Sequence, residues 1–587
     1  MTCEEMIYSN DYADYMINYF DEQEGADEQF QNACVNPIID KIAILHMKKP
    51  RDYMTNLERT PYSFIPKLFG LMDSSNMEAV GVKQVKSNSG IGITGKNVIV
   101  GFVDTGIDYT NPLFLGADGS TRIGVIWDQS IENSSRESDD NLETDEVSNK
   151  SITDDRNIPI PLYGTVFAKS QIEEALIQEN PYEIVPSRDE NGHGTFMTGI
   201  VAGGENREND FVGIASDAEI AVVKLKEAKP YLKEYFGVPQ TATAYQETDV
   251  MYAVEYLLRY ADARNLPISI YIGVGSSNGG HNGLTYLERY LTNILENPGI
   301  MISVPAGNEG NERLHYAGDM AEEEDMVEVE FNIAEGQETL VLEFWGDAPT
   351  TFAVGLVSPQ GDRIERIPPR FGKEEVLRLP LAKSTIYVAY QMIETYSGDE
   401  LIFIRITNPI AGLWKLLVSA ADGRKRTFNI WMPLRQFLQR ETYFLRAEPN
   451  NTITNPGNAP LVTTMTAYNH LNGSVYAESG RGFISKQLVK PDMAAPGVDV
   501  TGPGLRKNYV TKTGTSVAAA HAAGIFALFL QWNQENTELG ELYAAQIQNL
   551  FYKSATRSSD MNYPSIIWGY GIINAQQVFE QFRIIET

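Results

Sequence analysis

The chain has 587 residues, which is too long for one ordinary hydrophobic core and predicts two or three domains. Hydrophobic residues make up 43% of it and aromatic residues 10%, as in globular rather than disordered proteins. The formal net charge of −31 argues against binding to nucleic acid, because a polyanion would be repelled.

The chain shows no sign of secretion or membrane insertion. Its first residues, MTCEEMIYSNDYADYM, are acidic and lack the basic and apolar regions of a secretory signal. No run of about 18 apolar residues is present, so we expect nothing to span a membrane. The only cysteines, Cys3 and Cys34, lie outside any metal-ligand spacing. They exclude a disulfide framework and permit a reducing compartment.

The first 72 residues carry short elements of both kinds. The stretch DKIAILHMKKP predicts a strand, RDYMTNLER a short helix and YSFIPKLFGLM an extended end. We therefore expect a small α+β region ahead of the main domain.

The stretch GIGITGKNVIVGFVDTGID, from Gly90 to Asp108, first suggests a phosphate-binding loop, because it begins G-x-G-x-x-G-K. A dinucleotide fingerprint, however, places its glycines after a strand and before a helix. Here the strand NVIVGFVD follows the glycines, so they form a turn that enters a central strand. That strand does not alternate between polar and apolar residues, which predicts burial on both faces, as in a parallel sheet.

Asp104 ends this strand, where α/β proteins commonly place their chemistry. An Asp-Thr-Gly sequence also occurs in aspartic proteases, which need two carboxylates that share a proton. The chain has no second Asp-Thr-Gly or Asp-Ser-Gly, so aspartic chemistry is excluded.

Of the six histidines, only His193 lies in a tight glycine frame, NGHGTFMTGIVAGG, followed by small apolar residues typical of a buried helix. A Gly-His-Gly sequence by itself is more often a turn than a catalytic site. The loop before it, Glu132 to Asn157, is rich in acids, Ser and Asn. Its carboxylates leave a structural calcium ion open, although they lack the EF-hand spacing.

The next segment, TDVMYAVEYLLRYADARN followed by LPISIYIG, predicts a helix and then a strand, as in a doubly wound α/β sheet. ISVPAGNEGNE predicts another strand and a turn that carries Asn308, for which turn chemistry alone is a sufficient explanation. From about residue 313 to 450 the sequence changes to short β-branched or aromatic runs separated by turn residues. These runs predict an all-β sandwich.

Ser516 opens the stretch SVAAAHAAGIFALFLQW, which predicts a helix buried all round and thinned by small residues so that it packs closely on a sheet. A serine at a helix start is often a plain N-cap. His521, within this helix, is expected to pack in the core.

With Asp104, His193 and Ser516 in this order, the sequence resembles the subtilisin-like serine proteases (subtilases). The segments VIVGFVDTGID, NGHGTFMTGIVAG and GTSVAAAHAAG carry the resemblance, together with GIASDAEIAVVKLK and KPDMAAPG. The resemblance covers roughly residues 77–315 and 450–587. It implies a mostly parallel, doubly wound α/β sheet and a serine endopeptidase.

The resemblance also implies a role for each residue. Ser516 would be the nucleophile and His193 the general base and acid, while Asp104 would fix the imidazole tautomer. The side-chain amide of Asn308 would form the oxyanion hole with the backbone N–H of Ser516. A substrate peptide would pair in extended form along ISIYIGVGSSNGG. Tyr271 stands where the family more often has a small residue. The expected substrate-binding residues are Ile272, Gly273, Val274, Gly275 and Gly307.

The β-rich segment resembles the jelly-roll insert of the Csp proteases, subtilases associated with clostridial spore germination. We therefore expect four parts, namely a propeptide-like region (1–72), the catalytic domain in two segments (73–315 and 451–587) and a β-sandwich insert (316–450). The insert is expected to act as a rigid brace. The propeptide is expected to occupy the active-site cleft. The protein is expected to be a bacterial monomer, cytoplasmic or spore-associated, that acts on proteins or peptides. We expect it to need no cofactor and to bind neither nucleic acid nor a membrane.

Two functions remain open at this stage. The first is an active serine endopeptidase, whose target would be the precursor of a spore cortex-degrading enzyme. The second is a catalytically silent Csp-like pseudoprotease that acts as a binding or signalling module. The chain keeps all three triad residues and Asn308, which favours the enzyme.

Overall fold

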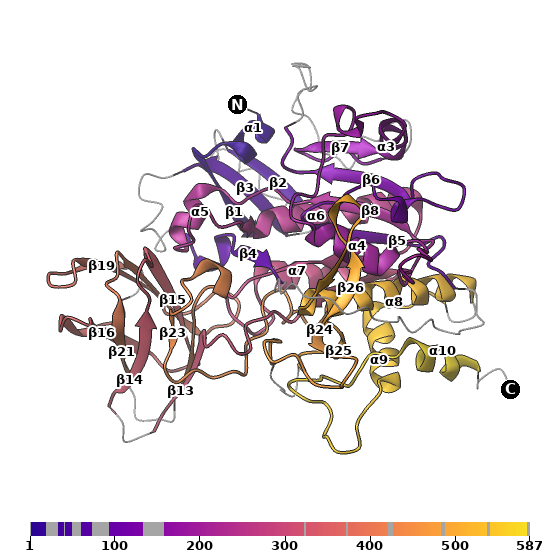
Figure 1. The fold of residues 1–587 in the computed structure, drawn as a ribbon. Helices are drawn as coiled ribbons and strands as arrows, with labels where there is room; N and C mark the ends of the chain where they lie inside the picture. Colours follow the sequence, from indigo (N-terminus) through magenta and orange to yellow (C-terminus); the bar gives the residue numbers. More distant parts are fainter. Residues whose placement is uncertain are drawn as a thin grey trace.

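The computed structural model describes most of the chain. It shows three parts, namely the N-terminal elements, a central sheet with its helices and a β-rich part (Figure 1). The N-terminal elements and the central sheet with its helices lie together, and a β-rich part extends to one side. The described residues are 2–18, 33–39, 41–49, 60–72, 93–132, 158–321, 325–370, 374–420, 426–482, 488–536 and 540–583. The helix expected over RDYMTNLER and the acidic loop from residue 133 to 157 lie outside them.

An eight-stranded sheet forms the centre of the molecule, in the order β25-β24-β12-β10-β5-β8-β6-β7. Its neighbouring strands are parallel, except that β6 and β7 pair antiparallel. The strand bounds are β5 Ile99–Asp104, β6 Ile123–Asp128, β7 Thr165–Ala168, β8 Glu219–Lys224, β10 Ile268–Ile272, β12 Ile300–Pro305, β24 Thr463–Tyr468 and β25 Met493–Pro496. This arrangement confirms the predicted doubly wound α/β class.

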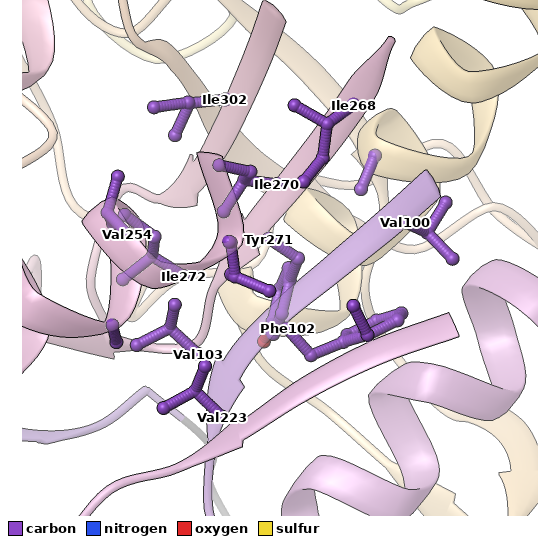
Figure 2. Close-up of a cluster of buried hydrophobic side chains, with 14 of the residues drawn as sticks. Val100, Phe102, Val103, Val223, Val254, Ile268, Ile270, Tyr271, Ile272 and Ile302 are labelled. Atoms are coloured by element: carbon purple, nitrogen blue, oxygen red, sulfur yellow. The ribbon is translucent and has the colours of Figure 1, made fainter. Parts of the chain in front are cut away.

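Burial on both faces explains why the central strands do not alternate. Every residue of β5 and β10 is buried, and the side chains of both strands fill the layers above and below the sheet (Figure 2). The helices of this part of the fold are α3 Lys169–Leu176, α4 His193–Ala202, α5 Pro230–Tyr235, α6 Glu247–Arg264, α7 Tyr286–Ile294, α8 Thr515–Glu535, α9 Ala544–Ser554 and α10 Ala575–Arg583.

Helices α8 and α6 cover opposite faces of the sheet. On β10, the Ser269 hydroxyl donates to the carbonyl of Ala523 in α8 at 2.8 Å. On β5, a Cβ at Gly101 would lie 3.0 Å from Leu257 in α6. Gly101 pairs with Ile270, the neighbour of Ser269, and successive side chains point to opposite faces. The small residues of α8 therefore let its backbone approach the sheet closely, as predicted.

The glycine turn before β5 binds a side chain of the protein itself. The backbone N–H groups of Thr94, Gly95 and Lys96 all donate to the side-chain oxygen of Gln531, at 2.9, 2.7 and 3.1 Å. Gln531 comes from the last turns of α8, so this turn closes the fold at the edge opposite the start of that helix. The part of the turn that contains Gly90 lies outside the described residues.

The β-rich part consists of two packed antiparallel sheets around a separate apolar core. One sheet has the order β13-β22-β15-β20-β19-β18 and the other β17-β16-β21-β14-β23. The strands are β13 His315–Met320, β14 Val327–Ile333, β15 Thr339–Gly346, β16 Phe352–Val357, β17 Arg363–Ile367, β18 Glu374–Leu379, β19 Ser384–Gln391, β20 Glu400–Thr407, β21 Gly412–Ala420, β22 Arg426–Trp431 and β23 Tyr443–Phe444. This is the sandwich that the sequence predicts.

The N-terminal region is a small antiparallel sheet, β1-β3-β2, preceded by a short helix. Its elements are α1 Cys3–Tyr8, β1 Tyr12–Asn18, β2 Cys34–Ile39 and β3 Ile42–Lys48. A disulfide joins Cys3 and Cys34, whose Cα atoms are 5.5 Å apart. The sequence expectation, which excluded a disulfide framework, missed this bond, because only the folded sheet brings the start of β2 beside α1.

Among the described residues, one helix is long and apolar enough to cross a membrane by length and composition, namely α8. Because 78% of its most apolar window is buried inside the protein, those criteria reflect its place in the core of the fold.

We predict that Glu288 makes stability depend on pH. Burial raises the pKa of this carboxyl to about 7, from 4.5. A raised folded-state pKa contributes stability that is present below pH 4.5 and is lost as the pH rises through 7. The loss is about 3 kcal/mol by pH 8. Glu288→Gln should therefore gain about 2.5 kcal/mol relative to wild type between pH 5 and pH 8, because part of the loss has already occurred at pH 5, measured by urea unfolding. An equal difference between the two proteins at both pH values would contradict this.

Candidate active site

Asp104 lies where the sequence places it, at the carboxyl end of β5 and fully buried. Its Oδ1 accepts the backbone N–H of Thr105 at 2.6 Å. The neighbouring chain passes so close that a Cβ at Gly273 would lie 1.9 Å from Oδ2. A glycine at this position is therefore what allows the β10 strand end and the carboxylate to share one small volume.

His193 is the first residue of α4 and is also fully buried. Its Nδ1 lies 2.8 Å from both carboxylate oxygens of Asp104. Gly192, before it, has φ +83°, a left-handed conformation that suits glycine. A Cβ at Gly194, after it, would lie 2.1 Å from the carbonyl of Gly106. The glycine frame thus lets the imidazole approach the strand end, which favours the catalytic interpretation over a simple turn.

Asp189 fixes the turn that carries His193, and sequence analysis missed it. Its carboxylate accepts the N–H of Gly192 at 2.8 Å and both the N–H and the hydroxyl of Thr195, at 2.9 and 2.7 Å. The hydroxyl of Thr105, next to Asp104, also donates to it at 2.9 Å. The signal was present as an Asp four residues before the histidine, in the spacing of a side chain that caps the following helix.

Ser516 is the second residue of α8 and is fully buried. Its Oγ donates to the carbonyl oxygen of Met72 at 2.6 Å. The hydroxyl thus contacts a peptide carbonyl of the chain's own N-terminal region, rather than capping its own helix, which was the simpler expectation.

Asn308 follows β12 and is anchored to the residue before Ser516. Its Oδ1 accepts both the N–H and the hydroxyl of Thr515, each at 3.1 Å. The Thr515 hydroxyl in turn accepts the N–H of Gly307 at 3.1 Å. With the oxygen end of the amide held in this way, the Nδ2 end is the one that remains to donate at the cleft. Sequence analysis did not single out Thr515, because a threonine at a helix start is ordinary.

A strand of the N-terminal region, β4 Leu68–Leu71, lies between two edge strands of the main domain. It pairs antiparallel with β11 Val274–Gly275 on one side and with β9 Tyr245–Gln246 on the other. This is recognition of an extended peptide by strand addition. The sequence pointed to the first of these edges but gave no signal for β9, which is only two residues long.

Among the five residues expected to bind substrate, three contact this strand or Met72, the residue that follows it. Val274 and Gly275 pair with Leu71 and Gly70, and the carbonyl of Gly273 accepts the N–H of Met72 at 3.5 Å. Ile272 instead belongs to the buried β10. Gly307 lies beside Thr454, where a Cβ would be 2.6 Å from its Oγ1.

The side chain of Met72 is buried in a pocket next to Gly275 and Thr454. A Cβ at Gly275 would lie 3.2 Å from the Met72 sulfur, and the Thr454 hydroxyl contacts that sulfur at 3.8 Å. Thr454 comes from the loop that follows the insert, and sequence analysis missed it. Nothing local marks it, since its role depends on where the fold places the loop.

Tyr271 does not enter the cleft. Its ring is fully buried, and the ring centre lies 6.1 Å from that of Phe102. Both residues belong to the buried cluster drawn in Figure 2. A Cβ at Gly273 would touch the Tyr271 ring at 3.0 Å. This large residue therefore fills the layer beneath Asp104 and leaves the peptide-binding edge unchanged.

Within the part of the chain that the structure describes, no group of three or more His, Cys, Asp or Glu residues is placed to hold a metal ion. The acidic stretch for which calcium was left open falls almost entirely outside that part. The expectation that the chain needs no cofactor, with calcium left open for this stretch, therefore stays a prediction.

The sequence model of the subtilase family (Peptidase S8) matches residues 95–366 and 416–571. Among solved structures, the chain is similar to the Clostridium perfringens CspB protease, with 29% identity and a TM-score of 0.72 over 84% of this chain and 95% of that one. Fervidolysin from Fervidobacterium pennivorans, a keratinolytic enzyme related to subtilisin, is 13% identical, with a TM-score of 0.45 over 97% of this chain and 61% of its own. No similar sequence was found among the curated proteins compared with the chain.

The two ends of the Asn308 amide give a test of the site. In Asn308→Asp, the carboxylate keeps an acceptor for Thr515 but loses the Nδ2 donor. We expect the fold to be retained and kcat on a peptide substrate to fall about 10²–10³-fold, the usual effect of removing one oxyanion donor. Asn297→Asp, which removes an exposed amide donor before β12, is the control and should keep its kcat. An unchanged kcat in Asn308→Asp would remove Asn308 from the site.

Proposed function

The chain belongs to the subtilase family and is a subtilisin-like serine endopeptidase, and we propose that Asp104, His193 and Ser516 form its catalytic triad. One observation carries this proposal. The Ser516 hydroxyl lies 2.6 Å from the carbonyl oxygen of an extended segment that is held between two edge strands. The Nδ1–carboxylate contact of 2.8 Å supplies the second half of the triad.

These positions support the following reaction. Ser516 Oγ attacks the carbonyl carbon while His193 Nε2 accepts its proton. Asp104 accepts the Nδ1–H, which fixes the tautomer and stabilises the imidazolium. The negative charge on the carbonyl oxygen would be stabilised by Asn308 Nδ2 and the Ser516 N–H at the start of α8. The imidazolium then donates its proton to the leaving amine. In the second stage a water molecule attacks the acyl-enzyme while His193 accepts its proton, and His193 returns that proton to the Ser516 oxygen as it leaves.

We propose further that the first substrate is the chain itself, cut between Met72 and Asp73. The Met72 carbonyl is the one that the Ser516 hydroxyl contacts, and the Met72 side chain fills the pocket beside Thr454. Cleavage there would leave residues 1–72 as a propeptide in the cleft. A buried hydrogen-bond network supports this arrangement, since His46 of β3 contacts Asp14 at 2.6 Å and Tyr252 of α6 at 3.1 Å.

The occupied cleft also favours a second candidate, a binding module that cuts nothing. A strand of four residues paired on both sides would compete strongly with any external peptide. The two candidates differ in whether Ser516 reacts.

We predict that wild-type protein labels with a serine-directed fluorophosphonate and that Ser516→Ala does not. Wild type should yield a chain that begins at Asp73, identified by mass spectrometry, and Ser516→Ala should remain at full length. The His521→Ala variant, altered within the same helix, serves as the control and should label. Full-length wild-type protein that neither labels nor processes would favour the binding module.

For the physiological substrate, we propose the inactive precursor of a spore cortex-degrading enzyme. The β-sandwich insert and the similarity to the CspB protease support this. In an extract of dormant spores from the source organism, wild-type enzyme should shorten such a precursor, and Ser516→Ala should leave it intact. Mass spectrometry of new N-termini would detect the cut. New termini found only in unrelated proteins would refute this substrate.

A further inference from the structure

The insert reaches into the peptide-binding region through one buried carboxylate, Glu343 of β15. Its Oε1 accepts the side-chain amide of Asn278 at 2.7 Å, and its Oε2 accepts the N–H of Gly279 at 2.8 Å. The Tyr62 hydroxyl also donates to Oε1. Glu343 therefore connects the insert, the loop after β11 and the segment that leads into β4.

Lys67 is the charged residue in the segment from Tyr62 to Lys67, which leads into β4. Counted back from Met72 as the first, it is the sixth residue before the proposed scissile bond. Its side chain is 3% exposed, and its Nζ lies 4.2 Å from the centre of the Tyr62 ring. The ammonium donates to the carbonyls of Tyr62, at 2.8 Å, and Ile65. These neutral contacts satisfy its hydrogen bonds but leave its charge to be balanced by other groups.

Three buried carboxylates lie in the neighbourhood of this ammonium, namely Glu247 at the start of α6 and Glu343 and Glu394 of the insert. Glu247 also accepts the backbone N–H of Lys67 at 2.9 Å. A cavity of about 20 Å³ adjoins Lys67 and Glu394, which leaves room for about one water molecule.

The charge of Lys67 and the charges of the buried carboxylates stabilise each other. Burial lowers the pKa of Lys67, and the three carboxylates oppose that shift. Burial raises the pKa of Glu247 and of Glu343, and Lys67 opposes both shifts. A neutral side chain in place of Lys67 would leave buried carboxylates without a counter-charge, which is costly in a protein interior.

We propose that Glu247, Glu343 and Glu394 form a binding subsite for a lysine side chain at the sixth position before the scissile bond of a substrate. The propeptide fills this subsite with Lys67, and a substrate that replaces the propeptide fills it with its own lysine. The insert is therefore part of the substrate-binding surface and selects extended peptides that carry a positive charge at this distance from the cut. This inference rests on the proposed serine endopeptidase function.

The test compares two fluorogenic peptides that contain the sequence of residues 67–72, one with lysine and one with norleucine at the first position. Both are cleaved by the same preparation of processed enzyme, so the ratio of their kcat/KM values does not depend on the fraction of open active sites. We expect wild type to prefer the lysine peptide about tenfold or more, as for a partly desolvated charge contact. In Glu343→Gln this ratio should fall to within about twofold of unity.

Controls separate recognition from simple damage. Because Glu343 also holds Asn278 and Gly279, Glu343→Gln can lower the rates on both peptides, but a purely structural role would lower them equally and keep their ratio. Glu394→Gln gives a second, independent reduction of the ratio. Glu365→Gln, an exposed carboxylate on β17, is the matched insert control and should leave the ratio at its wild-type value.

The outcomes are distinguishable. A wild-type enzyme that labels with fluorophosphonate and cleaves both peptides equally overturns the subsite and leaves the proposed function standing. A preference for lysine that survives in both Glu343→Gln and Glu394→Gln also overturns it. Absence of labelling and of cleavage of both peptides overturns the proposed function and the subsite together.

Discussion

The site depends on the parallel register of three strands. Strands β5, β10 and β12 run side by side in one direction, so their carboxyl ends meet at one edge of the sheet. Asp104 ends the first, Gly273 follows the second and Asn308 follows the third. Since α4 and α8 both begin at this edge, His193 and Ser516 are brought there by their first turns. A slip of one residue in the pairing of β5 would turn the Asp104 side chain to the other face of the sheet.

The second constraint is the close approach of backbone segments to Asp104, which is possible because glycines occupy the positions nearest to it. A Cβ at Gly273 or at Gly194 would overlap the atoms around Asp104. Burying an ion pair such as Asp104 with a protonated His193 is favourable only when the remaining lone pairs are also satisfied. Thr105 supplies such a bond to Asp104, and Asp189 holds Thr105 through its hydroxyl. The hydrogen bonds around the proposed triad are thus as much a part of the candidate site as the triad residues themselves.

Sequence reasoning predicted the parts of the site that have local signals. Uninterrupted apolar strands gave the parallel sheet, and the glycine frame and the alanine-rich helix marked His193 and Ser516. Thr454, β9 and the Cys3–Cys34 bond have no such signal, because each arises only when distant segments meet. Glu343 illustrates the limit most clearly. In sequence it is one acid in a largely apolar strand, and only the packing of the insert places it against Asn278 and Tyr62.

The role of the insert follows from where it joins the main domain. The insert begins shortly after Asn308 and ends shortly before Thr454 in the sequence. Its two ends therefore flank the pocket that holds the Met72 side chain. Trp431 of β22 stacks between His281, at 4.1 Å, and His315, at 4.8 Å, and so fixes the insert to the loop after β11. Burial lowers the pKa of His281 to about 4, which keeps this stack uncharged near neutral pH. A brace attached at these points cannot shift without moving the walls of the peptide-binding site. Rigidity and recognition are therefore two consequences of one packing arrangement, rather than alternative roles for the insert.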